Sequence, residues 1–184
     1  MLQSVSKIRI KAILLKYFSK FKGKKRMTPL VSPAPLDIFI SLLGSLIGIS
    51  ILSLLLLVYK IPILAAPLGA SVVLVFWVSD APLSQPRNVI LGHTISAAIG
   101  VMTYQLWGMS WWSVAIGTST AILGMVLTKT THPPGGATAL LAILSAAEPS
   151  YIFTPILAGS LILILIGVLV NNLSPNRNYP RYWY

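Results

Sequence analysis

Six apolar segments occupy most of the chain between residues 36 and 170, and proline and glycine interrupt two of them. A membrane-spanning helix needs about 20 apolar residues, because the hydrocarbon core is about 30 Å thick and a helix rises about 1.5 Å per residue. The first, third, fourth and sixth segments are unbroken, whereas the second and fifth are broken. In chain order the segments cover residues 36–58, 63–79, 89–106, 111–127, 133–147 and 152–170. The sequence therefore predicts an all-α polytopic membrane protein.

The composition supports a membrane protein and excludes several chemistries. Charged residues make up 9% of the chain, against about 25% in soluble domains, and the mean hydropathy is +0.82. The acidic residues are Asp37, Asp80 and Glu148, and there is no cysteine, which excludes disulfides and thiolate chemistry. We expect no enzyme activity and no cofactor or metal, because the segments contain no carboxylate pair, Ser-His-Asp constellation or metal-ligand cluster.

Residues 1–35 form a distinct basic segment. Residues 1–26 hold nine of the fourteen basic residues and no acid. Apolar and basic residues alternate with helical spacing over residues 8–21, which is typical of an amphipathic helix lying on a membrane that contains anionic lipids. A nucleic-acid-binding arm and a transit peptide are alternatives, but the adjacent membrane segment favours the lipid surface, so we expect no nucleic acid partner.

The two broken segments resemble each other. The string from Pro67 to Ser71 (PLGAS) aligns with the string from Pro134 to Thr138 (PGGAT), and a lysine precedes each, at Lys60 and Lys129. This similarity predicts an internal repeat, with residues 36–107 as the first copy and 111–172 as the second. Each middle segment is expected to be extended at first and then helical, from Gly69 or Gly135 onward. These helices of about 16–20 Å would begin near the middle of the bilayer.

The placement of basic residues predicts the topology. If the basic N-terminus is cytoplasmic and all six segments cross, then Arg87, Lys129, Arg177 and Arg181 are cytoplasmic and Lys60 is outside. If the broken segments do not cross, Arg87 and Lys129 fall outside, against the positive-inside rule. Six crossings are therefore expected. Three crossings per repeat is an odd number, so the repeats are inverted, as in many transporters.

The segment ends carry aromatic residues, which suit the membrane–water interface. Residues 173–184 are expected to form a cytoplasmic C-terminal tail. An outer aromatic belt is predicted at Trp107, Trp111 and Trp112, and an inner one at Tyr179, Tyr182, Trp183 and Tyr184.

A helix that begins inside a membrane can bind an anion, because its first N–H groups and its dipole present positive charge. In inverted repeats the two helix N-termini would converge on one site, with Ser71 and Thr138 adding hydroxyl donors. The alternative is that the small residues serve close helix packing. The predicted substrate-binding residues are Gly69, Ala70, Ser71, His132, Gly135, Gly136, Ala137 and Thr138.

Three polar residues at the start of the third segment are candidates for a funnel or gate: Arg87, Asn88 and His93. Arg87 could equally be an interfacial anchor, and His93 a neutral histidine that bonds across helices. His132 could cap the broken backbone, gate the path or carry a proton. Because the segments lack a carboxylate, we expect any concentrative uptake to be linked to protons through His132 or His93.

Four strings resemble the HPP family of small membrane proteins: THPPGGATAL (131–140), PLGASVVLVF (67–76), SQPRNVILGH (84–93) and NNLSPNRNYP (171–180). The resemblance implies nitrite transport, an activity associated with cyanobacterial and chloroplast members. It also implies a bacterial inner membrane, or a chloroplast envelope if the source is a plant.

The function expected from these features is transport of a small inorganic anion, with nitrite as the substrate that the resemblance implies. An anion channel on the same scaffold and a non-transporting membrane scaffold or assembly subunit are the alternatives. A chain of this size is expected to form a homo-oligomer.

Overall fold

The structure is a computed structural model that describes residues 15, 17–19, 21 and 33–183, in two units that divide after Ser32. In the first unit residues 15 and 17–19 are helical, and the rings of Tyr17, Phe18 and Phe21 contact one another edge-on. The rest of the amphipathic helix predicted at residues 8–21 lies outside the described residues.

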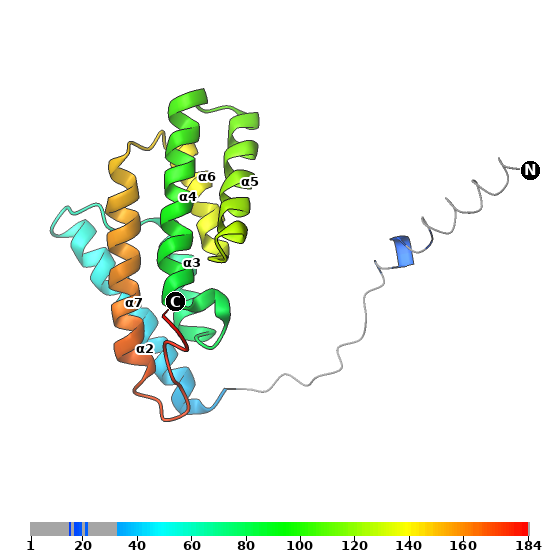
Figure 1. Cartoon of the computed structure of the whole chain (residues 1–184). Helices are drawn as coiled ribbons and strands as arrows, with labels where there is room; N and C mark the ends of the chain where they lie inside the picture. Colours follow the sequence, from blue (N-terminus) through cyan, green and yellow to red (C-terminus); the bar gives the residue numbers. More distant parts are fainter. Residues whose placement is uncertain (1–14, 16, 20, 22–32, 184) are drawn as a thin grey trace, which may run out of the picture. The chain divides into compact units, whose positions relative to one another are not determined.

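The second unit is built from helices (Figure 1). In chain order they are α2 (Pro35–Leu57), α3 (Ala66–Val72), the π-helix η2 (Val73–Trp77), the 3₁₀-helix η3 (Pro82–Ser84), α4 (Pro86–Trp107), α5 (Trp111–Leu127), α6 (Pro133–Leu144), the π-helix η4 (Ile152–Leu157) and α7 (Ala158–Asn171). Three helical stretches of the described chain have the length and composition to cross a membrane, namely α2, α4 and the joined η4–α7 stretch Ile152–Asn171. The chain is an integral membrane protein with helical spans.

The apolar helices outside these three are shorter. They are Ala66–Trp77, which combines α3 and η2, the 17-residue α5, and Pro133–Leu144. The two broken segments therefore contain short helices that follow a non-helical approach, at residues 60–65 and 130–132. The prediction that they begin at Gly69 and Gly135 is wrong: they begin at Ala66 and Pro133. The reason is that proline is tolerated in the first turn of a helix, where its missing N–H costs no hydrogen bond.

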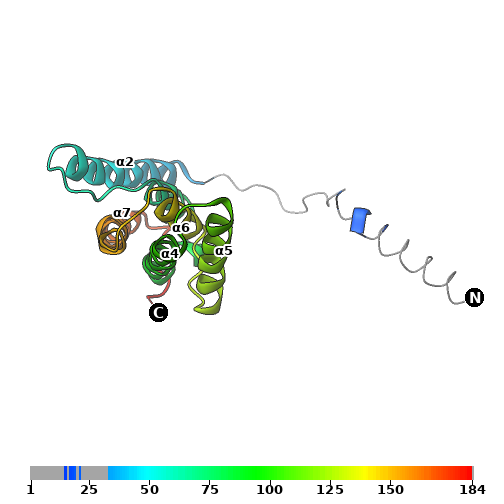
Figure 2. The same ribbon diagram turned by 90° about the horizontal axis from the view of Figure 1, so that it is seen from above.

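The helix packing has a matched pattern in the two halves. α2 packs on α7 and on η2, while α5 packs on α4 and on α6, and α3 contacts α6. Figure 2 shows α7 and α5 on opposite sides of α4. If the first half is exchanged with the second, the α2–α7 pair becomes α5–α4, the α2–η2 pair becomes α5–α6, and the α3–α6 pair is converted into itself. Lys60 and Lys129, which precede the two short helices, both have left-handed backbone geometry, with φ of 58° and 57°.

Pairs of glycines make equivalent close contacts in the two halves. A Cβ added to Gly92 of α4 would lie 2.8 Å from the carbonyl oxygen of Thr130, and one added to Gly159 of α7 would lie 2.8 Å from that of Ile63. Gly92 and Gly159 have the same sequence separation as Pro67 and Pro134. The glycines therefore let α4 and α7 touch the chain just before each short helix. These matched contacts are those expected of two structural repeats.

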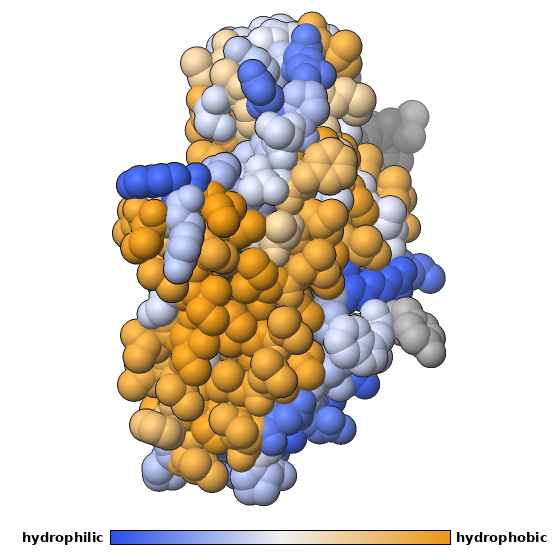
Figure 3. Space-filling view, turned by 90° about the vertical axis from the view of Figure 1, so that its left-hand side faces the viewer, coloured by the Kyte–Doolittle hydropathy of each residue, from blue (hydrophilic) through white to orange (hydrophobic). Residues whose placement is uncertain are grey.

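The surface of the unit is widely apolar. Large side chains such as Leu46, Leu127 and Leu169 are more than half exposed, and Figure 3 shows a broad apolar face bordered by polar residues. Such a face is typical of a protein that contacts lipid. Trp107, Trp111 and Trp112 are also exposed, as an aromatic belt requires.

The C-terminal residues fold back on the helix ends. Tyr179 is only 1% exposed, so its assignment to an inner aromatic belt is wrong. Its hydroxyl donates to the carbonyl of Ser84, 2.8 Å away, and burial raises its pKa above the usual value, so the hydroxyl remains a neutral donor.

The last long helical stretch also departs from the prediction, because the backbone leaves helical geometry at Thr154, just before Pro155.

Candidate functional site

Four side chains predicted to be functional form one buried network. Ser71 lies on α3, His93 on α4, His132 at the N-cap of α6 and Thr138 on α6, and each is 0% exposed. The network therefore joins the two short helices through the long helix α4. The remaining predicted residues lie around it, and their positions are given below.

The imidazole of His93 lies between the two hydroxyls that the repeat alignment pairs. Its Nε2 is 2.7 Å from the Oγ of Ser71, and its Nδ1 is 2.6 Å from the Oγ1 of Thr138. The Oγ of Ser71 is also 2.8 Å from the Nε2 of His132, and the two imidazole centroids are 4.8 Å apart. The network ends at the Nδ1 of His132, which is 2.8 Å from the carbonyl oxygen of Leu83.

This last contact fixes the hydrogen-bond directions along the network when both imidazoles are neutral and each of its contacts is a hydrogen bond. The Oγ of Ser71 and the Oγ1 of Thr138 also lie 3.2 Å and 3.3 Å from the carbonyl oxygens of Pro67 and Pro134. A carbonyl oxygen can only accept, so Nδ1 of His132 carries the hydrogen and its Nε2 accepts from the Ser71 hydroxyl. Ser71 must then accept from Nε2–H of His93. Nδ1 of His93 in turn accepts from the Thr138 hydroxyl. The hydrogens thus point in one direction from Thr138 to Leu83.

Local sequence explains why the network can form. The extended backbone before α6 places His132 against α4, and Gly92 makes room for it, because a Cβ on Gly92 would lie 2.8 Å from the Cβ of His132. Gly135 permits the same closeness one turn later. A Cβ on Gly135 would lie 3.0 Å from the Gly92 carbonyl oxygen and 3.1 Å from the Oγ of Ser96.

The start of α6 has few backbone donors. Pro133 and Pro134 have no N–H, and the N–H of Gly135 donates to the carbonyl of His132 at 2.8 Å. Gly136, Ala137 and Thr138 follow within α6, where N–H groups donate to carbonyls four residues earlier. The polar groups available at this helix end are therefore mainly side chains. One of them, the Oγ of Ser96, is fully buried and has no hydrogen-bond partner within the described residues.

The structure separates the other predicted binding residues from the network. Ala70 and Ala137 are exposed and line an apolar groove of about 270 Å³ between α3 and α6, together with Ala66, Pro67, Leu140, Leu141 and Leu144. A Cβ added to Gly136 would make ordinary contacts with Ile122 of α5, and nothing lies within 4 Å of a Cβ added to Gly69.

Arg87 and Asn88 lie at the start of α4 and bind the chain between α5 and α6. The guanidinium of Arg87 donates to the carbonyl of Thr128 at 3.2 Å, and the amide of Asn88 donates to that of Thr131 at 2.9 Å. Both residues therefore tie α4 to the extended approach that carries His132. Within the described residues, no group of three or more His, Cys, Asp or Glu is placed to hold a metal ion.

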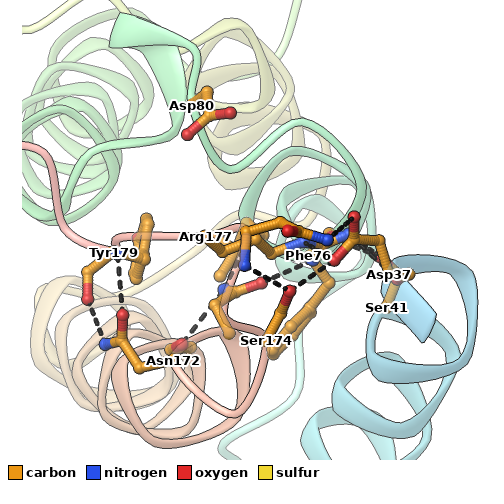
Figure 4. A network of polar contacts seen from close by, with 12 residues as sticks. Asp37, Ser41, Phe76, Asp80, Asn172, Ser174, Arg177 and Tyr179 are labelled. Atoms are coloured by element: carbon orange, nitrogen blue, oxygen red, sulfur yellow. Dashed lines mark hydrogen bonds and ion pairs between the residues drawn. The ribbon is translucent and has the colours of Figure 1, made fainter. Parts of the chain in front are cut away.

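Sequence reasoning missed a second polar network, centred on Arg177 (Figure 4). The guanidinium of Arg177 donates to the carbonyls of Phe76 and Asp37 and to the side chains of Asn171 and Ser41, at 2.7–2.9 Å. It also forms an ion pair with Asp37 at 3.5 Å, and both side chains are largely buried. Arg177 thereby satisfies a carbonyl at the end of η2. Asp37 lies in the first apolar segment of the sequence, and a buried carboxylate needs a cationic partner. This acid could therefore have indicated that a basic residue pairs with it.

Comparison with known proteins gives the family. Residues 31–180 match the family model described as HPP, transmembrane region. The chain belongs to this family. The family resemblance seen in the sequence is thereby confirmed, and the HPP region covers both short helices and both polar networks.

Two curated relatives come from Dictyostelium discoideum and are named only as transmembrane proteins. One is 40% identical over 194 residues, covering 96% of this chain and 60% of the relative, and the other is 35% identical over 189 residues, covering 95% and 66%. The chain thus spans less than two thirds of the length of each. No solved structure matches the chain.

Proposed function

We propose that this HPP-family chain transports a small inorganic anion across its membrane, with nitrite as the first substrate to test. The observation that carries the proposal is the buried network of Ser71, His93, His132 and Thr138, which joins the two short helices. Ionisable groups inside a membrane are costly and usually mark the path of a substrate or a proton. In transporters built from two repeats the substrate binds where the broken segments of the repeats meet, and a network that connects both broken segments supports a site there.

An inverted repeat is the architecture that best accounts for the matched contacts of the two halves. The close contacts of Gly92 and Gly159 and the shared geometry of Lys60 and Lys129 support a repeat. With three crossings in each repeat, the two short helices would enter the bilayer from opposite sides. Alternating access then needs one repeat to move against the other around a fixed site.

The charges support a cytoplasmic location for both chain ends. Arg177 and Arg181 bond to Asp37 and Asp80 at the end of the bundle where α2 and α4 begin, and Arg87 lies at that end as well. Under the positive-inside rule this end is the cytoplasmic one. Lys60 lies beyond the opposite end of α2.

Two features favour an anion as the substrate. The N-terminus of α6 has a positive partial charge, and the unpartnered Oγ of Ser96 lies beside its first turn. Nitrite is chosen because the family resemblance implies it. The site is closed in this structure, since each member of the network is fully buried, so substrate entry requires α6 or α3 to move.

The proposal is tested by nitrite uptake into liposomes that contain the purified chain. We expect saturable uptake above that of protein-free liposomes, and at least a tenfold loss in Ser71→Ala, which removes the bridge between the imidazoles. Ser160→Ala is the matched control: it also removes a buried hydroxyl, which bonds to the Leu157 carbonyl outside the network, and should retain uptake.

Three results would change the conclusion. Absence of protein-dependent uptake for nitrite and for other small inorganic anions would overturn the proposal in favour of a scaffold. Unitary currents without saturation would make the protein a channel. Equal loss in Ser71→Ala and Ser160→Ala, with both proteins monodisperse on gel filtration, would place the site elsewhere.

A further inference from the structure

The hydrogen count of the buried network sets a condition on anion binding. When His93 and His132 are neutral, each hydroxyl and imidazole hydrogen is already donated within the chain from Thr138 to the Leu83 carbonyl. An anion needs hydrogen-bond donors, and the four side chains of the neutral network have none to spare; the hydroxyl beside them that has no partner among the described residues is that of Ser96. The network in this form is therefore closed to an anion electrostatically as well as sterically.

One added proton changes this. If the proton binds Nδ1 of His93, that atom no longer accepts, and the Thr138 hydroxyl is released to donate to an anion or to the Pro134 carbonyl, 3.3 Å away. If it binds Nε2 of His132, the Ser71 hydroxyl is released in the same way. Each protonation thus supplies one positive charge and one free hydroxyl donor at the place where α3 and α6 meet.

The added charge has no anionic partner among the described residues around it. The titratable groups facing the network are the two imidazoles themselves, Arg87 from the start of α4, which donates to Thr128, and the hydroxyl of Tyr151, 3.5 Å from the Thr138 carbonyl oxygen. The helices α3, α5 and α6 and the turn η3 contain no charged residue.

The carboxylates of the described chain are placed elsewhere. Asp37 pairs with Arg177, Asp80 pairs with Arg181, and Glu148 follows the end of α6. A buried charge without a counter-charge is unstable by several kcal/mol. An imidazolium in this network is therefore stable only when an anion is bound beside it.

We infer that the network binds one proton together with one anion, so that the chain is an electroneutral proton–anion symporter. The inference rests on the proposed function and specifies its coupling. Proton and anion stabilise each other: the proton frees the donors, and the anion supplies the counter-charge. The neutral network and the doubly occupied network carry the same net charge. The transport cycle thus moves no net charge across the membrane.

The coupling predicts two responses of opposite kind. A one-to-one symporter accumulates its anion about tenfold for each unit by which the outside pH is lower, and a membrane potential leaves this ratio unchanged. A uniporter for a monovalent anion instead follows the membrane potential. It accumulates the anion about tenfold for each potential difference of about 59 mV, inside positive, and a pH gradient has no effect on this ratio.

The experiment measures steady-state and initial nitrite uptake into liposomes containing the chain, with pH gradient and membrane potential imposed separately. Protein-free liposomes correct for permeation of undissociated nitrous acid. We expect protein-dependent uptake to follow the pH gradient at zero potential and to be unaffected by an imposed potential. The double variant His93→Gln/His132→Gln, which keeps hydrogen-bonding groups but does not titrate, should lose the pH response, and Ser160→Ala should keep it.

Uptake that follows the potential and ignores the pH gradient would refute electroneutral coupling and leave the proposed transport intact. A full pH response in the double variant His93→Gln/His132→Gln would refute the role of the network. If the wild-type chain gives no protein-dependent uptake at all, the proposed function itself fails, and the inference fails with it.

Discussion

Removal of Arg177 should strongly destabilise the membrane domain. Its guanidinium donates four hydrogen bonds and pairs with Asp37, and the two side chains are only 11% and 14% exposed. In Arg177→Ala, the Asp37 carboxylate and the Asn171 side chain lose a partner in a largely buried place. The Phe76 carbonyl still accepts from the Ser41 hydroxyl, so the losses do not add.

The magnitude follows from the hydrogen bonds that the guanidinium donates to buried groups. A hydrogen bond to a charged group contributes about 1.5–3 kcal/mol, and the bond to the fully buried Asn171 side chain is lost in Arg177→Ala. For globular chains of this length, 1 kcal/mol corresponds to about 2–4 °C, so Arg177→Ala should lower the melting temperature by about 3–12 °C. Arg177→Lys should be nearly as harmful, because one ammonium group cannot bond to acceptors in four directions.

Arg181→Ala is the matched control for this prediction. Arg181 lies on the same C-terminal segment and pairs with Asp80 at 2.8 Å, but the two side chains are 48% and 62% exposed. Exposed pairs contribute at most about 1 kcal/mol, and the backbone N–H of Arg181 keeps its bond to Gln85. The assay is thermal unfolding in detergent followed by gel filtration. A shift below 2 °C for Arg177→Ala, or equal shifts for the two variants, would refute the reasoning.

Three further predictions concern the network and the repeats. Gly92→Ala and Gly159→Ala should each destabilise the protein by about 1–3 kcal/mol, because the new Cβ would lie 2.8 Å from a carbonyl oxygen. Gly136→Ala should be tolerated, because the nearest atom to its Cβ would be 3.7 Å away. Equal melting temperatures of all three variants would contradict this prediction. The chain has two histidines, and ¹⁵N solid-state NMR should show Nδ1–H on one and Nε2–H on the other; a single shared tautomer would contradict the hydrogen-bond direction. Single cysteines at the exposed residues Lys60 and Lys129 should be labelled from opposite sides of the membrane, and labelling from the same side would exclude inverted repeats.

Sequence reasoning located most of the helices, because apolar length and the positions of proline and glycine determine where a chain can cross a membrane. It also identified Ser71, His93, His132 and Thr138 as functional candidates. Their connection through the His93 ring could not be predicted, since it depends on how closely α4 approaches α6. Gly92 and Gly135 permit this close approach, because the carbonyl oxygens of Thr130 and Gly92 lie opposite them. These contacts are known only from the three-dimensional structure.

The assignment of Tyr179 to an aromatic belt failed, and the contacts of Arg177 were missed, for the same reason. An apolar-to-polar transition in the sequence predicts where a membrane segment ends and not how the following residues fold. In the structure these residues return to the helix ends and bond to buried carbonyls. Ala70 and Ala137 directly precede Ser71 and Thr138 in the sequence, but in the structure they are exposed and line the groove between α3 and α6 and are not part of the buried network.

The most direct test of the central claim is the number of protons taken up when nitrite binds to the purified protein. Isothermal titration calorimetry near neutral pH, in buffers of different ionisation enthalpy, gives this number without a membrane. The account predicts saturable binding with one proton taken up per nitrite, because the neutral network must gain a proton to provide both donors and counter-charge. Binding without proton uptake would contradict the claim that proton and anion share the His93–His132 site.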